Sequence, residues 1–333
     1  FTMFIPRYAA ATLGAASILL FSFSQASAQQ LNIGTNPVGS LYYAAGATLA
    51  KTLAPRVKTT VQPHAGSSIV LSLVDNGEVQ LGLASMNEAR LAYRGKKPFL
   101  PAPKVRLLSI MFPLFGGMIV RNDSPIRTIA ELKGKKLAGE FKAQLTVLHL
   151  NGAVLAGAGL SWNDAQGTPV PNIINGSQLL VENRINAIYF AVGPAKLREI
   201  DATIPGGVRF LPIVGTPDGL KRMAAHTPGT FARELPKGVS PALKANTLLQ
   251  GFENYLFASS DMADATVDKL VRALHELEPN IKKSAPFFRQ FSRQSMAKTN
   301  ATIPFHKAAV KAYKDLGLWN AGLDKAQAAL LAK

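Results

Sequence analysis

The sequence of 333 residues contains no cysteine, which excludes disulfide bonds, a thiolate nucleophile and zinc or iron–sulfur sites with cysteine ligands. Acidic residues are scarce: 20 Asp and Glu stand against 37 Lys and Arg, so the formal net charge is +17. Dense basic blocks are also missing, because the Lys and Arg residues occur singly or in pairs such as Lys96-Lys97. This scatter disfavours nucleic-acid binding. It indicates a solvated basic surface, or one that attracts anionic solutes or a membrane surface.

Common catalytic motifs are missing as well. The five histidines form neither H-x-x-H nor H-E-x-x-H, and neither a G-x-S-x-G elbow nor a G-x-x-x-x-G-K-[ST] phosphate loop is found. The glycines of Gly157-Ala158-Gly159 follow an expected helix, whereas a dinucleotide fingerprint must follow a strand. We therefore expect no metal, no cofactor and no enzymatic activity. An exported enzyme that uses Glu140 or His149 stays a rival, although neither has a catalytic partner evident in the sequence.

Long apolar runs are confined to the N-terminal stretch. Arg7 precedes the apolar run 9–23, and Ala26-Ser27-Ala28 is a small-x-small cleavage signal. We expect residues 1–28 to be a signal peptide that is cleaved after Ala28, with an uncleaved membrane anchor as the alternative. Beyond this stretch, charged residues or prolines interrupt every apolar segment, so no transmembrane helix is expected.

Cleavage would leave roughly 300 residues, which is more than one hydrophobic core usually organises and suggests two domains. Short apolar segments alternate with amphipathic ones, a pattern typical of an α/β sheet with helices on its faces. An apolar loop is expected at 111–115 and surface structure at 215–241. The expected strands are 31–35, 59–63, 79–84, 105–110, 117–121, 137–139, 168–171, 187–192, 208–213 and 255–259.

An internal similarity supports two lobes of similar build. Segments 76–85 and 182–191 share one plan, in which a helix end is followed by a turn residue, an alternating strand and a small residue. Each follows a Gly-Ser pair that we expect at a helix start, Gly66-Ser67 and Gly176-Ser177. The alternative is a chance match produced by ordinary strand–helix alternation.

Small residues recur where a strand is expected to turn into a helix: Ser40, Ser67, Ser68, Ser85 and Gly193. Backbone N–H groups at a helix N-terminus favour a carboxylate or phosphate without any basic side chain. In open α/β sheets these turns gather at the carboxyl ends of the strands, where ligands bind. The sequence therefore predicts a cleft that binds a small anion, unless these residues only cap their helices, as we expect Ser67 to do.

Two adjacent tyrosines, Tyr42 and Tyr43, lie just inside the first expected helix. They offer a hydroxyl and an aromatic wall to the cleft. We expect one of them to point into the core and only the other to reach a ligand.

Four segments together resemble the mature TAXI-family receptors of TRAP (tripartite ATP-independent periplasmic) transporters. Segment 34–46 resembles the G-x-x-x-G-G-x-Y-Y-P-x-G opening of that family, and 66–83 its G-S-(helix)-G-E-x-D-L-A/G pattern. Segment 129–137 looks like its second-lobe entry, and 303–309 resembles its P-x-H-x-G-A segment. The resemblance covers the expected mature chain in the right order.

This resemblance implies a type II periplasmic-binding-protein fold with two α/β lobes joined by hinge strands. The first lobe would comprise 29–117 plus 256–333 and the second 118–255, with crossings near Gly117 and Tyr255. Such a receptor is periplasmic and monomeric, and it delivers a small carboxylate, such as glutamate or 2-oxoglutarate, to TRAP membrane subunits. A binding protein of similar fold for an ABC importer or a sensor kinase would share these features.

Matched position by position, the resemblance implies ligand contacts from both lobes, and two departures put the ligand's identity in question. The second-lobe turn that typically reads Gly-Ser-Gly-Thr stands here as 143–146, and Ala44 replaces the usual proline. A bulkier amide and an apolar group then enter where the backbone would approach the ligand. The implied ligand-binding residues are Ser40, Tyr42, Tyr43, Ser67, Ser68, Ser85, Gln144, Thr146 and Gly193.

Overall fold

The computed structural model describes residues 30–332, so the expected signal peptide lies outside the described residues. Its strands are β1 (Leu31–Thr35), β2 (Thr59–Pro63), β3 (Leu81–Ser85), β4 (Val105–Arg121), β5 (Lys136–Glu140), β6 (Gln166–Val170), β7 (Ala187–Ala191), β8 (Val208–Phe210), β9 (Phe231–Leu235) and β10 (Thr247–Ser259). Its helices are α1 (Leu41–Leu53), α2 (Ser67–Asp75), α3 (Met86–Tyr93), α4 (Leu145–Gly157), α5 (Ile173–Val181), α6 (Ala195–Thr203), α7 (Pro217–His226), α8 (Asp264–Glu276), α9 (Glu278–Ser284), α10 (Lys307–Asp315) and α11 (Ala321–Leu331). Short 3₁₀ helices occupy Ala130–Leu132, Trp162–Asp164, Pro286–Phe288 and Arg293–Ser295.

The strands form one sheet in the order β2-β1-β3-β10-β4-β7-β5-β6, with β8 beside β4 and β9 beside β10. β1 runs parallel to β2 and β3, and β5 runs parallel to β6 and β7, whereas β10 is antiparallel to β3 and β4. Strands that are parallel and connected by helices are covered on both faces. The mixed α/β architecture agrees with the sequence prediction.

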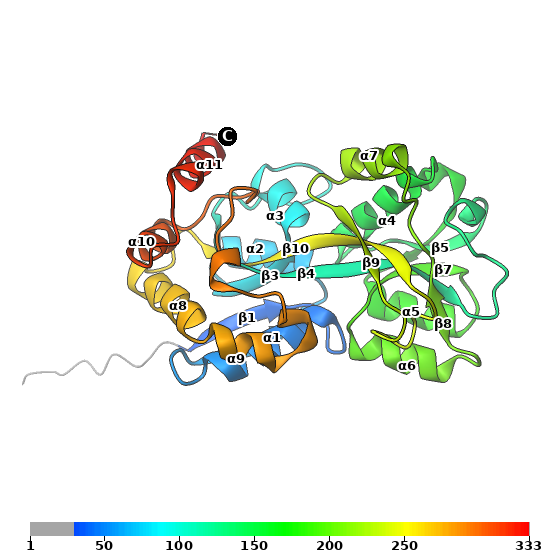
Figure 1. Ribbon diagram of the computed structural model, residues 1–333, viewed down its shortest axis with the longest axis horizontal. Helices are drawn as coiled ribbons and strands as arrows, with labels where there is room; N and C mark the ends of the chain where they lie inside the picture. Colours follow the sequence, from blue (N-terminus) through cyan, green and yellow to red (C-terminus); the bar gives the residue numbers. More distant parts are fainter. Residues whose placement is uncertain (1–29, 333) are drawn as a thin grey trace, which may run out of the picture.

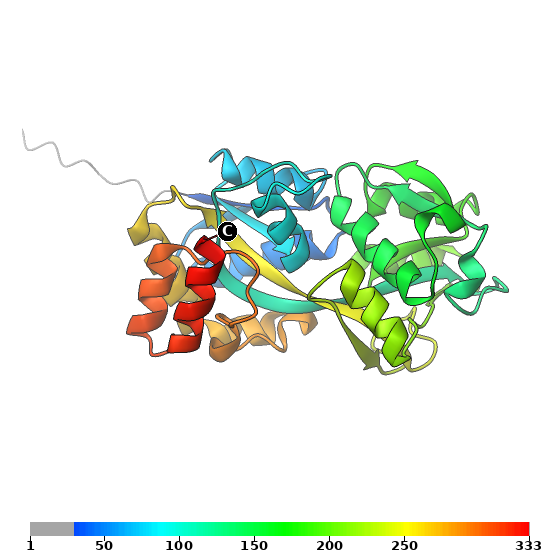
Figure 2. The same ribbon diagram turned by 90° about the horizontal axis from the view of Figure 1, so that it is seen from above.

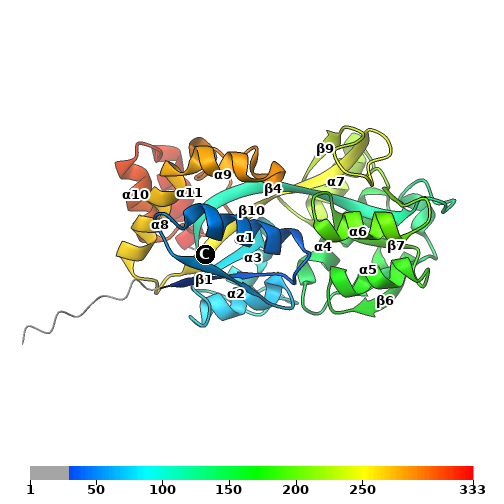
Figure 3. The ribbon, with the colours of Figure 1, turned by 90° about the horizontal axis from the view of Figure 1, so that it is seen from below.

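Two groups of elements lie at opposite ends of the long strands β4 and β10 (Figure 1). We call β1–β3, α1–α3 and α8–α11 the first lobe, and β5–β9 and α4–α7 the second lobe. Figures 2 and 3 show from above and below that β4 and β10 pass from one lobe to the other. In the second lobe α4 and α7 cover one face of the sheet and α5 and α6 the other (Figure 1).

The pairing partners of the two crossing strands change between the lobes. β4 pairs with β7 from Gly116 onward. β10 pairs with β9 up to Gly251 and with β3 from Asn254. Because β4 and β10 also pair with each other across this point, the lobes are joined by a two-stranded connection.

The expected loop at 111–115 is a continuous part of β4, so that prediction was wrong. The register with β10 slips between Asn254 and Tyr255, and this leaves Met111 as the extra residue of a bulge. Pro113 is tolerated because β10 is the only neighbour paired with β4 at this point among the described residues. The apolar run is explained by burial on a crossing strand.

The segment expected at the surface, 215–241, is mostly exposed and contains α7, which Thr216 caps ahead of a proline in the first turn, and β9. Two further predictions need correction. Gly176-Ser177 lies inside α5 and not at its start. The N-cap of α2 is Gly66, so Ser67 is the first helical residue and not the cap.

The remaining chain follows its sequence pattern closely. β1 and α1 begin where the apolar alternation and Ser40 indicate, and the side chain of Ser40 accepts a hydrogen bond from the N–H of Tyr43 at 3.1 Å. No helix among residues 30–332 is both long enough and apolar enough to cross a bilayer.

Candidate functional site

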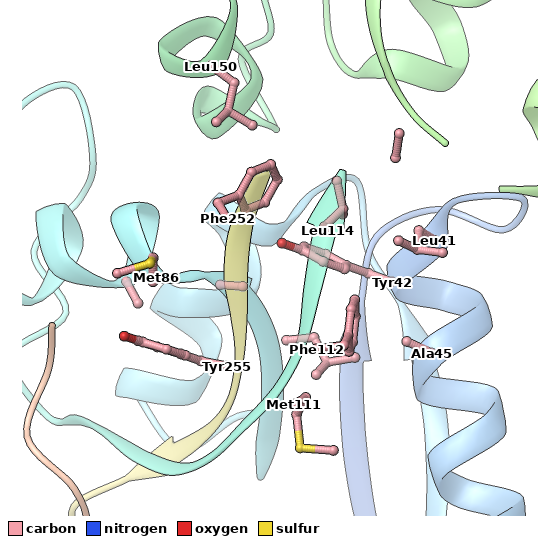
Figure 4. Packing of buried hydrophobic residues seen from close by; sticks show 14 of the residues in the cluster. Leu41, Tyr42, Ala45, Met86, Met111, Phe112, Leu114, Leu150, Phe252 and Tyr255 are labelled. Carbon is pink, nitrogen blue, oxygen red and sulfur yellow. The ribbon is translucent and has the colours of Figure 1, made fainter. Parts of the chain in front are cut away.

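A small cavity of about 50 Å³ lies between the lobes, where β4 and β10 pass from one lobe to the other. Figure 4 shows Leu114 and Phe252 on these strands, with Tyr42 of α1 beside them and Leu150 of α4 facing them. The lining residues come from both lobes and from the crossing strands: Asn36, Ser40, Leu41, Tyr42, Leu114, Gln144, Thr146, Val147, Leu150, Ile173, Tyr189, Ala191, Pro194 and Phe252.

The N-termini of four helices meet at this cavity. Ser40 caps α1 and Gln144 precedes α4, while Ile173 begins α5 and Pro194 precedes α6. All four residues line the cavity. Each helix N-terminus carries a partial positive charge, so the four together favour a bound anion.

Several backbone donors at these helix ends are free. Ser40 satisfies the N–H of Tyr43, but within residues 30–332 the N–H groups of Leu41, Tyr42 and Thr146 donate to no other group. A buried N–H group without a partner is costly. These donors are therefore available to an anionic ligand.

Two tyrosine hydroxyls reach the cavity from opposite lobes. The hydroxyl of Tyr42 donates to Asn254 Oδ1, and that of Tyr189 donates to Gln250 Oε1 at 3.0 Å. Burial, the negative charge of Glu88 and the neighbouring Tyr189 hold the pKa of the Tyr42 hydroxyl well above its usual range. Burial also raises the pKa of Tyr189. Both phenols stay neutral, and β10 fixes their orientation.

Two amide side chains complete the polar lining. Gln144 Oε1 accepts from the N–H of Ile173 at 2.8 Å, which ties the starts of α4 and α5 together. Asn36 is 7% exposed, and its Oδ1 is buried without a hydrogen-bond partner among the described residues. An unpaired buried acceptor in a cavity wall indicates a place for a ligand group.

The lobes contact each other directly beside the cavity. Ser85 Oγ lies 3.0 Å from Thr146 Oγ1, and Ser68 Oγ accepts from the N–H of Leu145 at 3.0 Å. A methyl group placed on Gly66 would lie 1.7 Å from the carbonyl oxygen of Ala143. The structure is therefore a closed state in which the start of α2 lies against the start of α4.

A buried carboxyl group lies within these interlobe contacts. Glu88 is fully buried in the first turn of α3, and its Oε1 accepts from Ser68 Oγ at 2.5 Å. Burial raises its pKa to about 7, while the hydrogen bond from Ser68 opposes this shift. Because Ser68 also accepts from Leu145, a single hydroxyl links the carboxyl of the first lobe to the backbone of the second.

The nine expected ligand residues divide into three sets. Ser40, Tyr42, Gln144 and Thr146 line the cavity. Ser68 and Ser85 make interlobe hydrogen bonds beside it. The cavity lining does not include Tyr43, Ser67 or Gly193, although Ser67 is buried and Gly193 packs near Leu41.

Sequence reasoning missed three polar residues of this region. Asn36 follows β1 directly, so the strand-to-helix argument applied to Ser40 could have found it. Glu88 forms an S-x-x-E pattern with Ser85, a recognisable helix-start signal. Tyr189 lies in a wholly buried strand and could not be distinguished from the core.

The two residues named for a possible enzyme lie outside the cavity lining. His149 stacks on Phe99 with ring centroids 5.3 Å apart, and burial lowers its pKa. Glu140 is exposed and lies 3.6 Å from the ammonium group of Lys142. Among residues 30–332 no group of His, Asp and Glu is arranged to hold a metal ion.

Comparisons with known proteins give a family and a fold. A sequence model of the NMT1-like family matches residues 33–317. A solved structure described as a periplasmic transporter has a TM-score of 0.52 at 16% identity and covers 91% of this chain and 97% of that chain. An ancestral arginine-binding protein bound to arginine gives 0.50 at 15% identity and covers 75% of this chain and 93% of that chain. The alkanesulfonate-binding protein SsuA from Xanthomonas axonopodis pv. citri, bound to MOPS, has a TM-score of 0.49 at 17% identity and covers 90% of this chain and 83% of that chain. The fold matches that of type II periplasmic binding proteins, as the sequence predicted.

Proposed function

The chain belongs to the NMT1-like family, and on that premise we propose that it is a solute-binding receptor that captures a small organic anion between its lobes. The observation that carries this proposal is the meeting of four helix N-termini, from both lobes, at one buried cavity. Free N–H groups at three lining residues supply donors for a carboxylate or a similar group.

The proposed motion is hinge closure about β4 and β10. The lobes would comprise 29–117 plus 256–333 and 118–255, and a solute would bind the first lobe before the second closes over it. The interlobe contacts of Ser68, Ser85 and Thr146 support this, because they exist only when the lobes are together. A ligand that contacts both lobes stabilises the closed state by its differential affinity.

The delivery partner and the location are further parts of the proposal. The resemblance of 34–46 to the TAXI-family opening supports delivery to TRAP membrane subunits by a monomeric periplasmic receptor whose signal peptide is cleaved after Ala28. An ABC importer or a sensor kinase would use the same cleft. Neighbouring genes for TRAP membrane subunits separate these cases, because their absence favours an ABC importer or a sensor kinase.

Mass spectrometry of small molecules that co-purify with the protein, followed by calorimetric titration with the one found, tests the function. We expect one organic anion to bind per chain without chemical change. If anionic metabolites leave the melting temperature unchanged while a neutral compound raises it, the anion receptor is excluded. Conversion of the bound compound into a product would instead indicate an enzyme.

A further inference from the structure

We infer that the cavity selects a compact monoanion with an apolar body, and that Glu88 helps to exclude a second negative charge. This inference rests on the proposed function and narrows the expected class of ligand. It departs from the expectation of a dicarboxylate such as glutamate or 2-oxoglutarate.

The first argument is the charge of the lining. Among the described residues that line the cavity, none carries a charged side chain. Lys196, at the start of α6, pairs with Glu199 at 2.5 Å and is not part of the lining. Helix N-termini can balance one negative charge, but a second carboxylate buried without a cationic partner is strongly disfavoured.

The second argument is the chemistry of the walls. The cavity is enclosed by apolar side chains from α1, α4, β7 and the crossing strands: Leu41, Val147, Leu150, Ala191, Leu114 and Phe252. The tyrosine hydroxyls already donate to Asn254 and Gln250. A ligand beyond its anionic group therefore meets mainly apolar surface, which favours a hydrocarbon body over a second polar end.

The third argument is size. With the lobes in contact, the cavity measures about 50 Å³. A long ligand would hold Gly66 away from Ala143 and Ser85 away from Thr146. A compact ligand is compatible with the observed closed contacts.

The fourth argument is the position of Glu88. Its Oε1 accepts from Ser68 Oγ, which also accepts from the N–H of Leu145, between the lining residues Gln144 and Thr146. Its negative charge also contributes to the raised pKa of Tyr42, another lining residue. Its Oε2 is buried without a hydrogen-bond partner among the described residues. An ionised Glu88 therefore makes this side of the cavity unfavourable for a second carboxylate.

Calorimetric titration at pH 8 tests the inference with three pairs of acids. The two members of each pair have the same number of carbon atoms: propanoate and malonate, butanoate and succinate, and pentanoate and glutarate. We expect the preferred monocarboxylate to bind at least about tenfold more tightly than its dicarboxylate partner. The Glu88→Gln variant keeps an acceptor for Ser68 but removes a repelling charge. The ratio of monocarboxylate affinity to dicarboxylate affinity should therefore fall at least about threefold.

Glu253→Gln is the matched control. Glu253 lies on β10, is mostly buried and pairs with Lys298 at 2.9 Å, outside the cavity lining. This variant should leave the ratio unchanged. An equal fall in both variants would overturn the role of Glu88.

The outcomes separate this inference from the proposed function. Tighter binding of a dicarboxylate than of its matched monocarboxylate would overturn the inference and leave an anion receptor in place. Failure of all six carboxylates to bind would also overturn the inference, whereas the anion receptor is overturned only if anionic metabolites leave the melting temperature unchanged while a neutral compound raises it.

Discussion

At the scale of single residues, Glu88 shows how environment changes the role of a familiar motif. In an S-x-x-E capping box the carboxylate returns to the start of its own helix. Here Ser85 does cap the N–H of Glu88 at 3.2 Å, but the carboxyl group accepts from Ser68 of α2. The titratable groups on the elements packed against α3 are Asp75, His149, Glu253 and Tyr255.

Glu88→Gln should stabilise the protein at alkaline pH and make little difference at acidic pH. The pKa of Glu88 is raised from 4.5 to about 7 in the native state, so the folded protein holds this proton more tightly than the unfolded chain. That contribution to stability is fully present below pH 4.5 and is lost as the pH rises through about 7. Thermal denaturation between pH 4.5 and 8.5 should show the gain of the variant rising to at most roughly 3 kcal/mol.

Glu276→Gln is a suitable control for this pH series. Its carboxylate is exposed and pairs with Arg56, whose hydrogen bond lowers the pKa of Glu276. Removal of this group should give no gain at alkaline pH. A Glu88→Gln variant whose melting temperature differs from that of the wild type by the same amount at every pH would contradict a buried, proton-linked carboxyl.

The sequence predicted part of the cavity because its signals are local. Ser40 lies where a strand gives way to a helix, and such a position can be identified from the order of residue types, whereas Thr146 was expected only from the family resemblance. Tyr189 could not be predicted as a lining residue, since its exposure to the cavity depends on how the second lobe faces the first. The expected role of Ser67 as an N-cap failed because Gly66 adopts the capping position.

At the scale of elements, the crossing strands and the starts of helices control the site. β4 and β10 were expected to be shorter, because Pro113 and the run of large apolar residues around it do not resemble an ordinary strand. Strand pairing with a distant part of the chain overrides such local preference. The units in which a strand is followed by a helix were easier to predict than β4 and β10. In these units the spacing of the apolar residues and the capping residues indicate the same boundaries.

Gly66→Ala should prevent full closure without disturbing the first lobe. The φ angle of Gly66 is 176°, which alanine adopts without strain, yet the new methyl group would lie 1.7 Å from the Ala143 carbonyl oxygen. We expect a larger radius of gyration in small-angle X-ray scattering than for the closed wild type, and anion affinity at least about tenfold weaker.

The control for this variant is Gly167→Ala on β6, where a methyl group would have no atom within 4 Å. It should match the wild type in both scattering and affinity. If the Gly66→Ala protein binds the same anion as tightly as the wild type and has the same radius of gyration, closure at Gly66 is refuted.

At the scale of the whole molecule, the arrangement is a pair of lobes joined by two strands (Figure 1), with the cavity between the lobes. The net charge of +17 is consistent with attraction of anionic solutes toward the molecule. In the proposed receptor, the uncharged cavity would select an anion by shape and by helix-end donors, not by ion pairing. Long-range attraction and local selection are therefore separate properties of this chain.

The central claim is that helix N-termini from both lobes hold one anion together. Hydrogen–deuterium exchange with and without the co-purifying anion tests it most directly, because bound N–H groups exchange slowly. The account predicts new protection in the first turns of α1, α4, α5 and α6 together. Protection confined to one lobe, or absent from these four turns while the anion is bound, would contradict it.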